Sequence, residues 1–295
     1  MDIRVLRYFL AVAQERTISK AATTLHLSQP TLSRQLSDLE AELGVRLFTR
    51  GSREITLTAA GRYLQERATT ITRLVDKTAQ NLQTTAPIIR GSLDIGAGES
   101  RGMQRLMALI SRLQADYPGV TLHLHSGDAA TVAAQLTAGT LDFGVIMGDS
   151  PLTHYHALQL PERDRWGILL PKTAPLAQQT TIRPQDLVGH PLIVSQQAAT
   201  TDRFANWWRN VADQLTLSGT YNLIFNAQLL VEQGHCWALS FDHLVDVGPE
   251  SHLTFRPLAP DLTEPITVIW SRQQTLSPVA QLFLQRLRAN LGTPE

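Results

Sequence analysis

One short motif in this chain has the residue types and spacing of a catalytic turn. Gly98-Glu99-Ser100-Arg101-Gly102 fits the Gly-x-Ser-x-Gly pattern that exposes a nucleophilic serine between a strand and a helix. Asp142 or Asp149, followed by His235 or His243, would keep the order serine, acid, histidine. A hydrolase turn of this kind follows several strands and an upstream oxyanion loop, whereas here the chain before the motif reads as helical. Serine hydrolysis therefore stays an alternative.

Two other groups of side chains invite a chemical interpretation. His123-x-His125 and His154-x-His156 each place two imidazoles on one face of an extended segment, a spacing that metals use. Neither pair has an obvious third ligand, so we interpret them as strand-edge histidines and expect no metal or other cofactor. Trp207-Trp208 is expected to pack a helix against its domain, with contact to an aromatic effector as the alternative.

A helix near the amino terminus has the pattern that reading DNA requires. Ser28 can cap it, Pro30 is tolerated in its first turn, and it ends near Gly44. Its buried stripe is predicted to be Leu32, Leu36, Leu39 and Leu43. Arg34 projects almost opposite these leucines, with Pro30, Ser33 and Ser37 beside it. Small side chains around one guanidinium can enter a major groove, where Gln29 could read adenine. A solvated face is the alternative.

The elements around this helix complete a winged helix-turn-helix. Residues from about Ile3 to Arg16 predict a first amphipathic helix. Ser19 is expected to cap a short second helix that packs through small residues. An alternating run around Gly51-Ser52 predicts a hairpin wing, in which Arg50 and Arg53 could contact phosphates.

Charge is distributed unevenly along the chain. The whole chain has 26 basic and 26 acidic residues, but residues 1–62 hold nine bases and six acids, a net charge of +3. A positive field confined to this segment favours phosphate contact. The chain has no run of about 18 uninterrupted apolar residues, so no membrane span is expected. The single Cys236 excludes an internal disulfide and suits the reducing cytoplasm.

The amino-terminal segment resembles the signature of bacterial LysR-type transcription regulators, nearly without gaps over about 60 residues. The matching segments are Ser19-Lys20-Ala21-Ala22, Leu25, Leu27-Ser28-Gln29-Pro30-Thr31-Leu32-Ser33-Arg34-Gln35-Leu36, Leu39-Glu40, Leu43-Gly44-Val45-Arg46-Leu47-Phe48-Thr49-Arg50 and Leu57-Thr58-Ala59-Ala60-Gly61. The resemblance implies DNA contacts by five residues at the groove and two arginines at the wing: Gln29, Pro30, Thr31, Ser33 and Arg34, then Arg50 and Arg53.

A connecting helix is predicted from Thr58 towards Pro87, since only Gly61 interrupts it. Its apolar residues step by four and three, which is typical of a coiled-coil seam: Leu64, Ala68, Ile71, Val75, Thr78 and Leu82. Such a seam favours a dimer that reads a two-fold DNA site. A single helix packed on its own domain is the alternative.

The remaining two-thirds alternate between strands and helices, which predicts parallel βαβ units in two lobes. Strands are expected at Leu93-Asp94-Ile95-Gly96 and Val120-Thr121-Leu122-His123-Leu124-His125, and later in the second lobe at Tyr221-Asn222-Leu223-Ile224-Phe225. Two crossings, near 160–163 and 264–266, would form a hinge. A cleft between such lobes binds ligands where strands end and helices begin.

The family resemblance implies a sensing domain similar to periplasmic binding proteins. By position, the implied effector-binding residues are Glu99, Ser100, Arg101, Ser126, Gly127, Ser195, Gln196 and Asn226, with Gly98, Asp128 and Gln197 in the same segments. Ser100 is the foremost candidate, because a hydroxyl at a strand-to-helix turn can bond a carboxylate. Glu99 and Arg101 are less familiar there and argue against a simple anion. Ordinary cap and turn residues are the alternative.

These observations predict a multi-domain α/β protein with three parts. Residues 1–58 form a winged helix-turn-helix, 59–88 a linker and dimerisation helix, and 89–295 a two-lobed effector-binding domain. Lobe I takes 89–161 and 266–295, and lobe II takes 162–265. We expect a DNA-binding regulator controlled by a small-molecule effector, acting as a homodimer or homotetramer on promoter DNA and on RNA polymerase. A stand-alone solute-binding module is the non-catalytic alternative.

Overall fold

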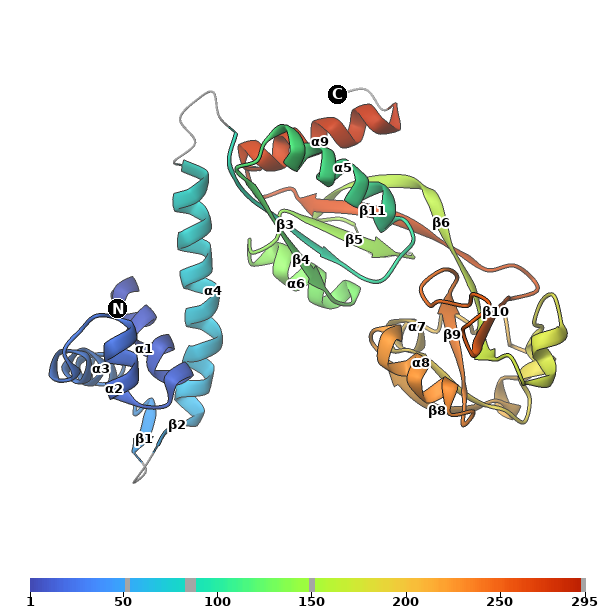
Figure 1. The fold of residues 1–295 in the computed structure, drawn as a ribbon, viewed down its shortest axis with the longest axis horizontal. Coiled ribbons are helices and arrows are strands. Elements are labelled where there is room, and N and C mark those ends of the chain that lie inside the picture. Colours follow the sequence, from blue (N-terminus) through green and yellow to red (C-terminus); the bar gives the residue numbers. More distant parts are fainter. Residues whose placement is uncertain (51–53, 83–88, 149–151, 293–295) are drawn as a thin grey trace. The chain divides into compact units, whose positions relative to one another are not determined.

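The computed structural model describes residues 1–50, 54–82, 89–148 and 152–292, and the chain divides into two compact units, Met1–Gln83 and Thr84–Glu295. The first unit begins with three helices, continues with a short antiparallel hairpin and ends in a long helix (Figure 1). Its elements are α1 (Ile3–Glu15), α2 (Ile18–Thr24), α3 (Gln29–Leu43), β1 (Phe48–Arg50), β2 (Ile55–Leu57) and α4 (Ala59–Leu82).

The first three helices begin at side chains that accept a backbone hydrogen bond. Asp2 caps α1, Thr17 caps α2, and Ser28 caps α3 as predicted, accepting from the amide of Thr31. The prediction that Ser19 caps the second helix was wrong, because Thr17 already has the extended conformation of a cap and Ser19 lies inside the helix. Gly44 ends α3 in the left-handed conformation, as predicted.

The leucines of α3 hold it in a small core. Leu32, Leu36 and Leu39 are buried as predicted, but Leu43 is 38% exposed because α3 ends at this residue. The core also takes residues from α1, α2, the segment before β1 and α4: Leu6, Phe9, Val12, Ala21, Ala22, Leu47, Leu64 and Ala68. Packing against several elements fixes which face of α3 remains outside.

The predicted seam of the long helix α4 divides into two parts. Leu64 and Ala68 are buried in the core of their own unit, so the expectation that they pair with a second chain was wrong. Further along, Ile71, Leu74 and Val75 are 37%, 41% and 41% exposed. Tyr63, in the first half, is 63% exposed, but the exposed aliphatic residues of α4 all lie in the second half of the helix.

The second unit is built on strands that carry the chain between two lobes. Its strands are β3 (Gly91–Ala97), β4 (Val120–Ser126), β5 (Phe143–Met147), β6 (Tyr155–Pro171), β7 (Pro191–Ser195), β8 (Thr216–Tyr221), β9 (Trp237–Phe241), β10 (Leu253–Pro257) and β11 (Thr263–Ser271). They follow the order β4-β3-β5-β11-β6-β9-β7-β8, and β10 pairs with β6. The first half of β6 pairs with β11, and its second half pairs with β9 and β10 (Figure 1).

Helices cover the sheet on both sides in each lobe. In lobe I, α5 (Met103–Asp116) and α9 (Pro278–Leu291) share one core, and α6 (Ala129–Thr137) contributes to a second. In lobe II, α7 (Gln196–Thr200) belongs to one core and α8 (Ile224–Glu232) to another. Three short 3-10 helices complete this lobe, η1 (Pro175–Gln178), η2 (Pro184–Leu187) and η3 (Ala212–Gln214).

The topology agrees with the parallel βαβ expectation only in part. Strands β4, β3 and β5 are parallel, as are β8, β7 and β9, whereas β6, β10 and β11 run antiparallel to their partners. The expected strand at 221–225 was wrong, because β8 ends at Tyr221 and α8 begins at Ile224. Both predicted crossing points lie within β6 and β11, whose pairing shifts register between Pro265 and Thr267. No helix among the described residues is long and apolar enough to cross a membrane.

Candidate DNA-binding face and effector pocket

The outer face of α3 carries the residues that sequence reasoning singled out. Gln29, Pro30, Thr31 and Arg34 are exposed, and Ser33 is half-buried. The cap at Ser28 and the buried leucines fix this face. Within the described residues, no hydrogen bond or ion pair holds the Arg34 guanidinium, so it can reach an external acceptor.

The start of α3 is tied to α2 by a side-chain contact. The hydroxyl of Ser19 donates to Oε1 of Gln29 at 3.1 Å, and the hydroxyls of Ser28 and Thr31 lie 2.7 Å apart. The bond from Ser19 occupies the acceptor of the Gln29 amide. Its Nε2 remains as the donor that this side chain can present to a base.

The hairpin β1–β2 forms where the wing was expected, with Phe48 opposite Leu57 and Arg50 opposite Ile55. Of the two wing arginines, Arg50 ends β1 but its side chain lies outside the described residues, as does the whole of Arg53. The pairing of β1 with β2 supports a hairpin at the expected position, and the phosphate contacts of the two arginines stay a prediction.

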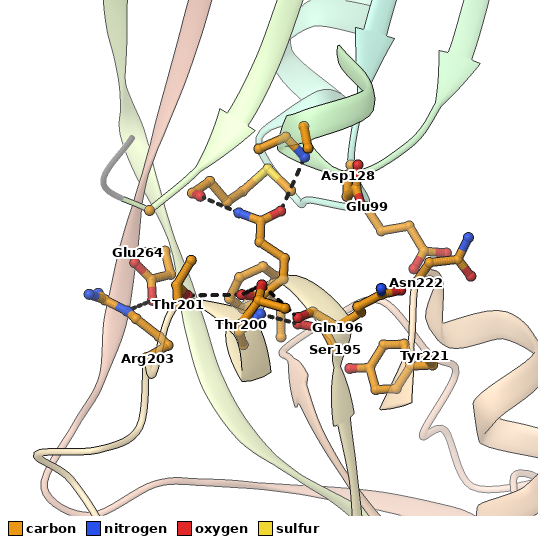
Figure 2. A pocket seen from close by; sticks show the side chains of 18 of the residues that line it. Glu99, Asp128, Ser195, Gln196, Thr200, Thr201, Arg203, Tyr221, Asn222 and Glu264 are labelled. Atoms are coloured by element: carbon orange, nitrogen blue, oxygen red, sulfur yellow. Dashed lines mark hydrogen bonds and ion pairs between the residues drawn. The ribbon is translucent and has the colours of Figure 1, made fainter. Parts of the chain in front are cut away.

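A pocket of about 530 Å³ lies in the second unit, where elements of both lobes meet. In Figure 2, Glu99 and Asp128 come from lobe I, whereas Ser195, Tyr221 and Asn222 come from lobe II. Of the residues implied by the family resemblance, four line this pocket: Glu99, Gly127, Ser195 and Gln196. Gly98, Asp128 and Gln197, from the same segments, also line it.

Ser100 and Arg101 are not among the residues that line the pocket. Ser100 is 7% exposed, and its Oγ accepts from the amide of Gly102 at 3.0 Å. It also hydrogen-bonds to Asp164, whose Oδ1 accepts from the amide of Arg101 at 3.2 Å. The contact of Ser100 is therefore with a carboxyl of the protein's own strand β6, and the pocket does not include the residue that the resemblance put foremost.

Ser126 and Asn226 also lie outside the pocket lining. Ser126 is the last residue of β4, and Asn226 is an exposed residue of α8, because the strand expected at its position is a helix. The lining residue from this part of the chain is Asn222, in the turn between β8 and α8. A strand-to-helix turn does contribute a lining asparagine, as the sequence suggested, but this turn lies four residues earlier in the chain than expected.

Sequence reasoning missed the part of the wall that comes from the hinge strands β6 and β11, from the ends of β8 and β9, and from the segment after α7. The missed lining residues that carry rings or charge are Trp166, Arg203, Tyr221, Phe241 and Glu264. None of them lies in a motif with its own spacing. Tertiary packing alone brings them together, so one sequence contained no signal for them.

Hydrogen bonds across the pocket connect the two lobes. Gln197 at the start of α7 accepts from the amide of Ala129 through Oε1 and donates through Nε2 to the carbonyl of Met147, both at 3.3 Å. Oε2 of Glu99 accepts from the amide of Ile224 at 2.6 Å, which joins the turn after β3 to the start of α8. Side chains of both lobes therefore join across the pocket.

Burial and hydrogen bonding shift the pKa values of two pocket carboxyls, Glu99 and Asp128, in opposite directions. It raises the pKa of Glu99, and the hydrogen bond from Ile224 opposes this shift. Hydrogen bonds from Thr131 lower the pKa of Asp128, which caps α6. Glu264 is 2% exposed, accepts from Nε1 of Trp166 at 2.8 Å and forms an ion pair with Arg203.

The described residues do not bring together the chemistry of the alternative interpretations. The described hydrogen bonds of the Ser100 hydroxyl involve Gly102 and Asp164 and no imidazole. His156 stacks on Trp270 with ring centroids 5.3 Å apart, and Nε2 of His125 lies 3.7 Å from Asp94. No group of three or more metal-ligating side chains is present in the described ranges.

Comparison with known proteins identifies both parts of the chain. The model of the "LysR substrate binding domain" matches residues 89–292, and that of the "bacterial regulatory helix-turn-helix protein, lysR family" matches residues 3–62. A probable RuBisCO transcriptional regulator of Synechocystis is 34% identical over 184 residues, and the match covers 62% of this chain and 53% of that protein. The chain therefore spans about half the length of this relative.

A second relative and one solved structure agree with these matches. The transcriptional regulator IlvY of Escherichia coli K12 is 29% identical over 210 residues, 71% of each chain. The crystal structure of full-length CbnR complexed with its target DNA has the same fold, with a TM-score of 0.78, 22% identity, and coverage of 98% of this chain and 99% of that one. With both of its units matched by models of one family, the chain belongs to the LysR family of bacterial regulatory helix-turn-helix proteins.

Proposed function

We propose that this protein is a promoter-binding transcription regulator whose action on DNA is set by a small molecule in the interlobe pocket. The observation that carries the proposal is the outer face of α3, where Arg34 is exposed without a described partner opposite three buried leucines. A guanidinium so placed can bridge O6 and N7 of guanine. The relatives of Synechocystis and Escherichia coli, which are transcriptional regulators, and the DNA complex of CbnR support the same interpretation.

We assign the groove contacts to Gln29, Pro30, Thr31, Ser33 and Arg34, and the phosphate contacts of the wing to Arg50 and Arg53. We assign DNA binding to residues 1–58, a linker to 59–88 and effector binding to 89–295, as the sequence predicted. Of the implied effector residues, we retain Glu99, Gly127, Ser195 and Gln196, which line the pocket. We assign Ser100, which does not line the pocket, a structural role in place of the effector-binding role that the resemblance implied.

Two exposed apolar surfaces support assembly of the chain with copies of itself. One is the second half of α4, with Ile71, Leu74 and Val75. The other is α8, on which Phe225 is 66% and Leu229 is 47% exposed. Two separate surfaces are what a homotetramer built from dimers requires. A paired head would read a two-fold DNA site.

The effector acts by preferring one arrangement of the two lobes. Glu99 and Gln197 connect the lobes across the pocket, so a ligand that alters these contacts changes the relative free energies of the open and closed forms. This difference is transmitted to the DNA-binding heads and, through them, to the recruitment of RNA polymerase. We place the protein in the cytoplasm, where promoter DNA is accessible.

The groove assignment is tested by Arg34→Ala, with Arg4→Ala as the matched control. Arg4 lies near the start of α1 and pairs with Asp2, so its loss removes the same charge away from α3. We expect Arg34→Ala to weaken binding to the gene's own upstream DNA roughly tenfold to a hundredfold at fixed salt, and to reduce the preference over scrambled DNA. Equal effects of the two variants on both DNAs would remove Arg34 from the groove.

A further inference from the structure

The interlobe pocket differs from an anion site in how its backbone donors are used. Three helices begin at its wall, and each of these starts already has an acceptor from the protein. Asp128 accepts from the amide of Thr131 at 2.8 Å at the start of α6, and Ser195 accepts from the amide of Ala198 at 3.2 Å at the start of α7. At each of these helix starts, at least one amide that could attract a carboxylate or phosphate is therefore already occupied by an acceptor of the protein.

The start of α8 is the clearest case, because its acceptor comes from the opposite lobe. Leu223 provides no side-chain cap to this nine-residue helix. The amide of Ile224 donates instead to Oε2 of Glu99, at 2.6 Å. An anionic effector would have to displace a carboxylate that is already held there.

The charges of the lining also disfavour an anion. Among the lining residues that the structure describes, Glu99, Asp128 and Glu264 are acidic and Arg203 is basic. Arg203 forms an ion pair with Glu264, which neutralises both groups. The charges of Glu99 and Asp128 remain, so the field inside the pocket attracts a cation.

The pocket also offers the surfaces that bind organic cations. Trp166, Tyr221 and Phe241 line it, and the ring centroids of Trp166 and Phe241 are 4.1 Å apart. Aromatic faces attract ammonium and guanidinium groups. Glu99 is half-buried, and its Oε1 has no hydrogen-bond partner among the described residues, which leaves an acceptor at the pocket wall.

We propose that the effector is an organic cation, an amine or guanidine on a short carbon chain, whose charged group binds to the carboxylate of Glu99 beside these aromatic rings. This inference rests on the proposed sensing function and names the ligand class of the same pocket. A cation pairs with Glu99 through Oε1, while Oε2 keeps its bond to α8. The cation therefore contacts Glu99 on lobe I, next to the hydrogen bond that joins Glu99 to Ile224 of lobe II.

The test is binding of a matched panel to the full-length protein, measured by calorimetry and by thermal shift. The cationic probes are 1,4-diaminobutane, 1,5-diaminopentane and agmatine, and the neutral and anionic probes of similar length are 1,5-pentanediol and glutarate. We expect one or more cations to bind the wild type in preference to pentanediol and glutarate. Glu99→Gln should weaken that binding roughly tenfold or more, because a partly buried charge pair is lost.

The choice of glutamine and a matched control distinguish a loss of ligand recognition from damage to the fold. Glutamine keeps an oxygen that can accept from the amide of Ile224, so the interlobe bond can survive while the charge is removed. Glu232→Gln is the control, since Glu232 is exposed at the far end of α8. It should leave cation binding unchanged.

Each contrary result has a distinct meaning. Glutarate or pentanediol binding as tightly as the cations would overturn the proposed ligand class and leave the sensing function intact. Cation binding that Glu99→Gln does not weaken would overturn the role of Glu99. If no amine or guanidine in the panel binds, the proposal is wrong. The promoter-binding measurement does not depend on any of these outcomes, so the two proposals fail separately.

Discussion

Asp164 and Glu264 are cross-strand partners on β6 and β11, the strands shared by the two lobes, and each is only 2% exposed. Oδ2 of Asp164 and Oε2 of Glu264 have no hydrogen-bond partner among the described residues. Burial raises the pKa of Asp164, bonds from Ser100 and Arg101 oppose the shift, and the charge of Glu264 adds a smaller increase. Ionisation of Asp164 therefore lowers the free energy of unfolding of this domain.

Asp164→Asn should remove this cost. The folded-state pKa lies above the unfolded value near 3.8, so as pH rises past 3.8 the unfolded chain ionises first and the wild type loses stability until the folded form ionises too. We expect Asp164→Asn to be more stable than the wild type at pH 7.5, by on the order of 1 kcal/mol. The difference should shrink as pH falls towards 3.8.

Urea denaturation at a series of pH values measures this difference. Asp213→Asn is the control, because Asp213 is exposed in η3 and should change little. A variant that is less stable than the wild type at pH 7.5, with the same pH dependence, would show that the ionised carboxylate stabilises the hinge.

Ser100→Ala separates a structural serine from a catalytic one. The Ser100 hydroxyl bonds both Gly102 and Asp164 from a buried position, so its loss should lower the free energy of unfolding by about 1–3 kcal/mol. Ser37→Ala, at an exposed position of α3, should have little effect. We also expect no turnover of p-nitrophenyl acetate that depends on Ser100. Serine-dependent turnover would restore the hydrolase alternative.

Gly61→Ala should destabilise the DNA-binding unit although alanine is the better helix former. A Cβ at Gly61 would lie 2.1 Å from the carbonyl oxygen of Leu47, a backbone atom that cannot move away cheaply. We expect a loss of more than about 1 kcal/mol in chemical denaturation. Gly219→Ala is the control, because its nearest neighbour would be 3.9 Å away. Unchanged or increased stability of Gly61→Ala would contradict the close approach of α4 to the hairpin.

The exposed half of α4 should hold two chains together. Replacing Leu74 and Val75 together by serine removes apolar surface without touching the core of the unit, where Leu64 and Ala68 lie. Sedimentation at a series of concentrations should show a dissociation constant raised by about tenfold or more. Thr69→Ser, on the opposite side of the helix, should leave it unchanged. An unaltered assembly state in the double variant would assign dimerisation to another surface.

The sequence predicted helix caps, helix ends and buried faces correctly where the local pattern is strong. It predicted tertiary contacts less well. The cap at Ser28, the end at Gly44 and the leucines of α3 follow from local rules and were predicted correctly. Leu64 and Ala68 fit a seam pattern equally well, but periodicity specifies a buried face and not which chain covers it. The division of α4 could be found only in three dimensions.

The pocket shows the same limit. Glu99, Ser195 and Gln196 sit at strand-to-helix turns, which sequence rules locate, and all three line the pocket. Asn226 was misplaced because the apolar run after Tyr221 fits a strand as well as a helix. Arg203 and Glu264 meet across 61 positions in the sequence, and no spacing rule indicates that pair. Long-range partners need the fold itself.

If the proposed function is right, α3 reads a specific promoter sequence. The most direct measurement is the affinity of the purified full-length protein for DNA upstream of its own gene, compared with scrambled DNA of the same length and composition, at one moderate salt concentration and with the cationic panel supplied. We predict a preference of about a thousandfold or more for the upstream DNA. Equal affinity for the two DNAs would contradict the account.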